Sequence, residues 1–214
     1  MTFFAAFLDE LSKIAKSVPM EEPGILFHGS PSRIKIIEPR SGVRGRKVFA
    51  TPSELMAKAY LAPWDDRTFG QFVDVEGPAW SKTRMGLVEM QPGAFEKVFA
   101  GKKGHVYEFP SKGFKPFGGT HVEMVGRKSV APVKVREIKD ILRELTRDPN
   151  FRLVRFDPKS EEFKKEVLHR RKIVAGMKPR ERADYERWFR RGGHPQVAEA
   201  VFSKMAAMGR RAER

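Results

Sequence analysis

The sequence contains no cysteine, which excludes a disulfide framework, a zinc site with thiolate ligands and a cysteine nucleophile. It has no apolar run long enough to span a bilayer. It also lacks the P-loop, the G-x-G-x-x-G fingerprint and the G-x-S-x-G turn. These absences exclude P-loop nucleotide hydrolases, dinucleotide-binding proteins of the G-x-G-x-x-G type and serine hydrolases of the G-x-S-x-G type. The sequence also has no residue spacing typical of a zinc site.

Acidic residues are few relative to basic ones. The 214 residues carry 42 Lys and Arg against 27 Asp and Glu, a net charge of +15. Residues 151–214 alone hold 18 basic and 9 acidic residues, so the excess is concentrated towards the C-terminal end. Such a charge favours a polyanionic neighbour, which the sequence leaves open between nucleic acid, an acidic protein surface and anionic lipid.

A hydrophobic content of 40% is sufficient for a folded core, and the length suits one domain with extensions. Residues 25–27 predict a short strand that ends at His28 and Gly29, residues 34–37 predict a second strand, and residues 48–51 predict a third. A helix is expected from Pro52 and Ser53 onward. Polar residues at a strand end are typical of binding sites.

The remainder of the chain divides into three kinds of segment. Residues 1–18 predict an amphipathic helix, which we expect either to pack on its own domain or to dock on a partner, with membrane-surface binding a third alternative. Residues 63–83 predict a long loop, and short strands follow at 87–90, 106–109, 122–125, 133–135 and 151–156. Helices are expected at 138–145, 160–174, 179–190 and 197–208.

Several short motifs resemble a known family. LFHGSP at 26–31, VFATPSELMAKAYLA at 48–62, GLVEMQP at 86–92 and VEMVGRKSVAPVKVREI at 122–138 are similar to the ADP-ribosyltransferase-like fold, in particular to rifampin ADP-ribosyltransferases and small phage and bacterial members. The resemblance implies an α+β domain with a split antiparallel β-sheet at 24–156. The expected organisation adds an N-terminal amphipathic helix and linker at 1–23 and a basic helical extension at 157–214.

The resemblance also implies a site for NAD. His28 matches the family's strand-end histidine, Gly29 the residue whose backbone meets the nicotinamide amide, and Glu123 the late-strand acid. A carboxylate there would offset positive charge as the bond between nicotinamide and ribose breaks. A core or solvated structural role is the alternative for each of these residues.

Three further residues complete the expected NAD site. Phe49 stands where the well-studied branch has Tyr, and it keeps the ring face for stacking but lacks the hydroxyl. Tyr60 is a second candidate for lining the same cleft, with packing as its alternative. Arg40, in a loop with Arg44 and Arg46, is expected to hold the pyrophosphate or to be solvated.

Three hypotheses about function follow. The first is NAD-dependent ADP-ribosyl transfer to an unknown acceptor. The second is a catalytically inactive structural or interaction protein of the same fold, such as one associated with a phage virion, that docks through its first helix and basic tail. The third is nucleic-acid binding by the tail, where Arg187, Arg190 and Arg191 flank Trp188 and Phe189. A poor signal-peptide pattern in residues 1–18 favours an intracellular or virion location.

Overall fold

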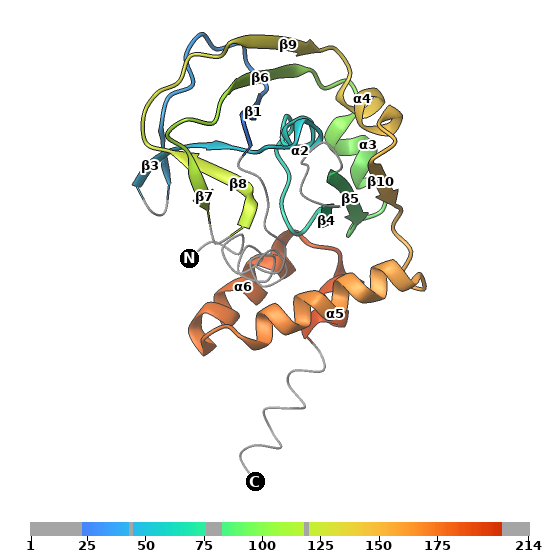
Figure 1. Cartoon of the computed structure of the whole chain (residues 1–214). Coiled ribbons are helices and arrows are strands. Elements are labelled where there is room, and N and C mark those ends of the chain that lie inside the picture. The colour runs from blue at the N-terminus through green and yellow to red at the C-terminus, as the bar shows by residue number, and fades with distance from the viewer. Residues whose placement is uncertain (1–22, 43–44, 76–82, 118–119, 203–214) are drawn as a thin grey trace. The chain divides into compact units, whose positions relative to one another are not determined.

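The computed structural model describes residues 23–42, 45–75, 83–117 and 120–202. Over these residues the protein is of the mixed α+β class, as the sequence predicts, with several small sheets (Figure 1). The described residues form two compact units that interleave along the chain. The first unit takes its residues from 1–63, 73–85 and 98–152, and the second from 64–72, 86–97 and 153–214. The expected N-terminal helix at 1–18 lies outside the described residues.

One sheet of the first unit consists of β1 (Ile25–Ser30), β6 (Gly104–Pro110) and β9 (Lys134–Ile138), in the order β1-β6-β9. Both pairings are antiparallel, with His28 opposite Tyr107 and Tyr107 opposite Val135. The sequence predicts all three strands, because each is a short apolar or β-branched run bounded by turn residues.

A second sheet has the order β2-β3-β8-β7 and is formed by β2 (Arg40–Gly42), β3 (Gly45–Ala50), β8 (Thr120–Gly126) and β7 (Lys115–Phe117). Phe49 of β3 pairs with Val125 of β8 in antiparallel register. A single bridge, Phe27 with Thr51, connects this sheet to β1. Residues from both sheets then share one core cluster, which comprises Leu26, Ile37, Val48, Ala50, Tyr107, Phe109 and Met124.

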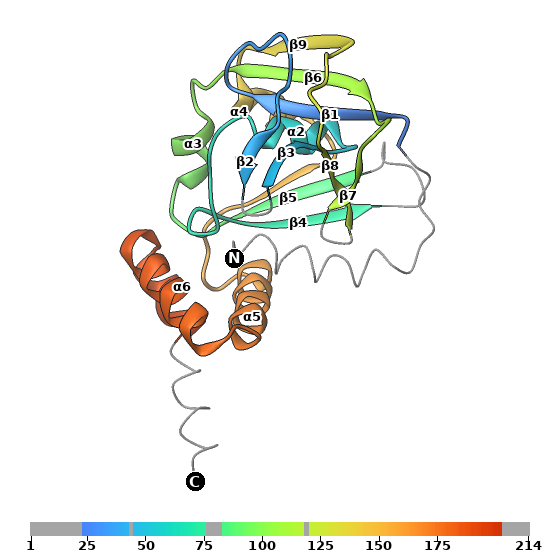
Figure 2. The same ribbon diagram turned by 90° about the vertical axis from the view of Figure 1, so that its left-hand side faces the viewer.

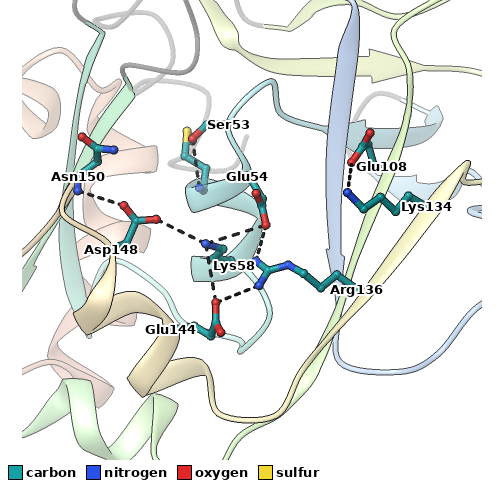
Figure 3. A network of polar contacts seen from close by, with 10 residues as sticks. Ser53, Glu54, Lys58, Glu108, Lys134, Arg136, Glu144, Asp148 and Asn150 are labelled. Carbon is teal, nitrogen blue, oxygen red and sulfur yellow. Dashed lines mark hydrogen bonds and ion pairs between the residues drawn. The ribbon is translucent and has the colours of Figure 1, made fainter.

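Two short helices pack in the same unit. Helix α2 (Glu54–Ala59) begins at the N-cap Ser53, and α4 (Ile141–Arg147) begins at Asp140, each with a side chain that accepts a backbone N–H of the first turn. An ion-pair network joins them to β9 (Figure 3). The ammonium of Lys58, a largely buried side chain, lies 3.4 Å from Asp148 and 3.9 Å from Glu144. Arg136 of β9 pairs with Glu144 at 3.1 Å and with Glu54.

A third sheet has the order β10-β5-β4 and contains β4 (Phe69–Val75), β5 (Thr83–Glu89) and β10 (Phe151–Val154). Helix α3 (Ala94–Phe99) follows β5. The carboxylate of Glu89, which is 2% exposed, accepts the backbone N–H groups of Phe95 and Phe156. This single buried acid thereby holds the start of α3 against the chain that follows β10.

Two longer helices belong to the second unit, α5 (Glu161–Ala175) and α6 (Pro179–Gly192). Residues 195–202 are also helical. Tyr185 and Phe189 of α6 pack against Phe202 at ring-centroid distances of 6.0 and 5.8 Å. The helices therefore pack around a core within the second unit, to which the segments 64–72 and 86–97 also belong. No described helix has the length and apolar character needed to cross a bilayer.

Two local predictions are wrong. Residues 34–37 form no strand, and only Ile37 makes an isolated bridge, with Val130. The backbone of Ile34 instead donates to the Tyr107 hydroxyl at 2.8 Å. Part of the predicted loop at 63–83 is β4. Tertiary pairing overrides local composition in each case.

Candidate functional site

His28 lies at the junction between the two sheets of the first unit. Its Nδ1 is 2.8 Å from the carbonyl oxygen of Phe49, and because a carbonyl only accepts, Nδ1 carries the proton in the neutral ring. Burial lowers the pKa of His28, and the positive charge of Arg40 acts in the same direction, although the bond to Phe49 opposes both. The imidazole is therefore neutral near pH 7 and its Nε2 is an acceptor.

Glu123 occupies the middle of β8, between the buried side chains of Val122 and Met124. Side chains alternate along a strand, so the carboxyl projects from the face opposite the core cluster that contains Met124. Its Oε2 is buried and has no hydrogen-bond partner among the described residues. Burial raises the pKa of Glu123 to about 8, and Lys47 lowers it by a smaller amount.

Lys47 and Phe49 of β3 project from the same face as Glu123, since they alternate with the buried Val48 and Ala50. The Phe49 ring packs edge-to-face on Phe117 at 5.5 Å, and the ammonium of Lys47 lies 4.5 Å from the centre of the Phe117 ring. One face of the second sheet thus combines two aromatic rings, a cation and a half-buried acid whose Oε2 is buried. We call Lys47, Phe49, Phe117 and Glu123 the β3–β8 face.

The structure brings some of the predicted site residues together and separates others. Phe49 links the two parts, because its carbonyl oxygen holds His28 and its ring belongs to the β3–β8 face. The His28 and Glu123 side chains do not contact each other directly within the described residues. Tyr60 is the half-buried C-cap residue of α2. Arg40 is exposed on β2, close enough to influence the pKa of His28.

Gly29 has a structural reason to be glycine. A Cβ added there would lie 2.2 Å from the backbone oxygen of Ala57 in α2, so the helix could not keep its place on β1. This close approach explains why the residue is glycine and requires no ligand. A contact between Gly29 and a nicotinamide amide stays a prediction.

Gly29→Ala is expected to destabilise the first unit by about 1–3 kcal/mol, because α2 must move to admit the methyl group. Gly24→Ala is the matched control, since a Cβ at Gly24 meets nothing within 4 Å, and we expect a change within about 0.5 kcal/mol. Urea unfolding at pH 7 measures both. Equal stability of the two variants would contradict the close packing of α2 on β1.

Sequence reasoning missed two members of the β3–β8 face, Lys47 and Phe117. The alternation of Lys47 with Val48 and of Phe49 with Ala50 already assigns Lys47 to the face of Phe49. Phe117 carries no such signal, because its strand β7 has only three residues and shifts register between Pro116 and Phe117.

The aromatic residues proposed for nucleic-acid stacking are committed to packing. Phe189 is fully buried, and Trp188 is covered by the guanidinium of Arg67 at 4.3 Å. Arg187 and Arg190 pair with Asp184 and Glu186 of the same helix. The structural alternative therefore explains these four residues of α6.

Comparisons with protein-family models, with curated proteins and with solved structures found no match to this chain. The described residues contain no group of three or more His, Cys, Asp or Glu side chains that could hold a metal ion. Any function therefore has to be inferred from the chain's own side chains.

Proposed function

We propose that the first unit binds NAD and transfers its ADP-ribosyl group to an acceptor, releasing nicotinamide. The observation that supports this most directly is the buried Oε2 of Glu123, which has no partner among the described residues. An unsatisfied buried carboxyl costs folding free energy, so its presence beside two rings and a cation favours a ligand that supplies the missing donor.

The β3–β8 face suits the nicotinamide riboside end of NAD. Phe49 and Phe117 offer apolar ring surface to a planar heterocycle. A ribose hydroxyl supplies the donor that Glu123 lacks. The Nε2 of His28 is a second acceptor, on strand β1, which the Phe27–Thr51 bridge connects to the end of β3. Lys47 carries the positive charge suited to a phosphate oxygen.

In the reaction, the bond between C1′ of the ribose and the ring nitrogen of nicotinamide breaks, and nicotinamide leaves with the electron pair. Ionised Glu123 stabilises the positive charge that develops on the ribose. His28 and Phe49 hold the ribose and the departing ring in position. A nucleophilic oxygen or nitrogen of the acceptor then forms the new bond to C1′ and loses its proton.

Nicotinamide release from NAD is the measurement that tests this proposal, with water and the protein itself as the available acceptors. Glu123→Gln and His28→Ala are each expected to reduce the rate by about 100-fold or more, the size typical of losing one preorganised electrostatic group. The wild-type rate is expected to rise with pH and to level off above about 8, because burial raises the pKa of Glu123 to about 8 and only the carboxylate is active.

Glu137→Gln is the matched control, because Glu137 is exposed on β9 and should leave the rate unchanged. Equal background release from the wild type and from all three variants would overturn the proposal. The inactive structural protein of the same fold would then be the better description.

A further inference from the structure

Several basic side chains lie around the turn between α5 and α6, and they form no ion pair within the described residues. Lys172 lies in the last turn of α5, and Lys178, Arg180 and Arg182 lie at the start of α6. Figure 2 shows the two helices meeting at this turn. Lys165 lies two turns earlier on α5, on the same stripe as Lys172. We call these five residues the α5–α6 corner; all are exposed except the half-buried Arg182.

The cations of the corner differ from other cations of the same unit. Lys164, Arg170, Arg187 and Arg190 each pair with an acid three or four residues away. Within the described residues, no ion pair occupies any of the five corner side chains. The acids within four residues of Lys178, Arg180 and Arg182 already have partners: Glu181 accepts the backbone N–H of Lys178, Asp184 pairs with Arg187, and Glu186 pairs with Arg190. Glu161, which Lys165 faces, already pairs with Lys164.

The surroundings of the corner favour a phosphate backbone over a lipid surface. A helix that lies in a membrane interface presents an apolar face beside its basic residues. Leu168 is the one large apolar side chain that is exposed in the described part of the second unit. A single leucine provides too little apolar area to insert, whereas separate point charges at two helix ends suit phosphate oxygens.

The same surroundings exclude recognition of bases by stacking. Arg67 lies over the ring of the half-buried Trp188, and Tyr185 and Phe189 are buried, so the aromatic rings of α6 offer little surface for stacking. We propose that the α5–α6 corner binds the phosphate backbone of nucleic acid and does so without sequence preference. This inference does not depend on the activity proposed for the first unit.

Counterion release sets the expected strength of the salt effect. Five phosphate contacts predict a slope of about −4.5 for log K against log salt on duplex DNA. Affinity is then expected to fall by about 10²–10³-fold between 50 and 200 mM NaCl. Duplexes of unrelated sequence are expected to bind with equal affinity.

Fluorescence anisotropy of the full chain with a labelled 20-base-pair duplex tests the inference. The variant K172Q/K178Q/R180Q removes three charges from the corner, and R187Q/R190Q/R191Q removes three charges from the last turns of α6. Each neutralised contact reduces the slope by about 1, so the corner variant is expected to lose about 3 from the slope. The α6 variant is expected to keep the wild-type slope.

Equal losses for the two variants would overturn the assignment to the corner, because they would indicate attraction by net charge alone. Tighter binding to vesicles containing 30% phosphatidylserine than to the duplex would identify a lipid surface as the partner and overturn it as well. Unchanged circular dichroism of both variants is the control for folding.

Discussion

Arg170→Met is expected to destabilise the second unit by about 3–5 kcal/mol, the size typical of removing one partner from a buried ion pair. Arg170 is 1% exposed, and its guanidinium pairs with Glu166 at 2.7 Å and donates to the carbonyl oxygens of Asp66 and Phe69. Methionine fills much of the volume but leaves a buried carboxylate and two buried carbonyl groups without their donor.

The loss of stability in Arg170→Met is expected to be smaller at pH 5 than at pH 8. Burial, with smaller contributions from Glu166 and Asp65, raises the pKa of Asp66 to about 6, and Arg170 opposes the rise. Without the guanidinium the pKa of Asp66 rises more, so at pH 5 the carboxyl takes up a proton and avoids part of the penalty.

Urea unfolding followed by tryptophan fluorescence measures the change, since Trp64 and Trp188 both belong to the second unit. Arg187→Met is the matched control, because Arg187 is an exposed arginine on α6 whose ion pair within the described residues is with Asp184. We expect the control to change stability by less than about 0.5 kcal/mol. A loss below about 1 kcal/mol for Arg170→Met would contradict the buried network.

The helices that carry their own boundary signals could be predicted from the sequence. Ser160 is the N-cap of α5, and its hydroxyl accepts the backbone N–H of Phe163 at 3.2 Å. Ser53 has the same role for α2. Both are polar residues placed directly before a periodic apolar pattern, which is the local arrangement that starts a helix.

The buried position of Arg170 could not be predicted in this way. It stands in a run of three basic residues, Arg170, Arg171 and Lys172, of which the last is exposed. The buried guanidinium of Arg170 donates to the backbone oxygens of Asp66 and Phe69, which lie more than one hundred residues earlier in the chain. Local sequence contains no information about such distant partners. The sequence therefore predicts a basic helical extension at 157–214, whereas the structure places the described part of this segment in a unit with its own core.

The candidate site shows the same division. The strand that carries His28 and the strand that carries Glu123 follow from apolar runs and turn residues, and so could be predicted, although β1 continues past His28 to Ser30. The bond from His28 to the Phe49 carbonyl depends on how two sheets meet at the Phe27–Thr51 bridge, and the unpaired Oε2 of Glu123 depends on which side chains surround β8. Such geometry requires coordinates.

Glu123→Gln is expected to make the protein more stable at high pH, even though the same change is expected to reduce the rate of nicotinamide release. Burial raises the pKa of Glu123 to about 8 in the folded state, against about 4.3 in an unfolded chain. The folded state therefore holds this proton more tightly. The stability that the proton provides is fully present below about pH 4 and is lost as the pH rises through 8.

Glutamine keeps the shape of the side chain and does not ionise, so the variant avoids the loss. Relative to the wild type, its free energy of unfolding is expected to increase by roughly 3–5 kcal/mol between pH 4 and pH 9. Urea unfolding of both proteins across this range measures the difference, and the other titrating groups are common to both. Glu137→Gln should show no such trend, because Glu137 is exposed on β9.

Lys47→Gln provides an independent check of the cause. Lys47 lowers the pKa of Glu123, so its removal should raise that pKa. The pH at which the protein loses stability should therefore move above 8 in Lys47→Gln. A parallel course of the wild-type and Glu123→Gln curves from pH 4 to pH 9 would mean that the carboxyl has a partner after all. The buried oxygen would then give no reason to expect a ligand on the β3–β8 face.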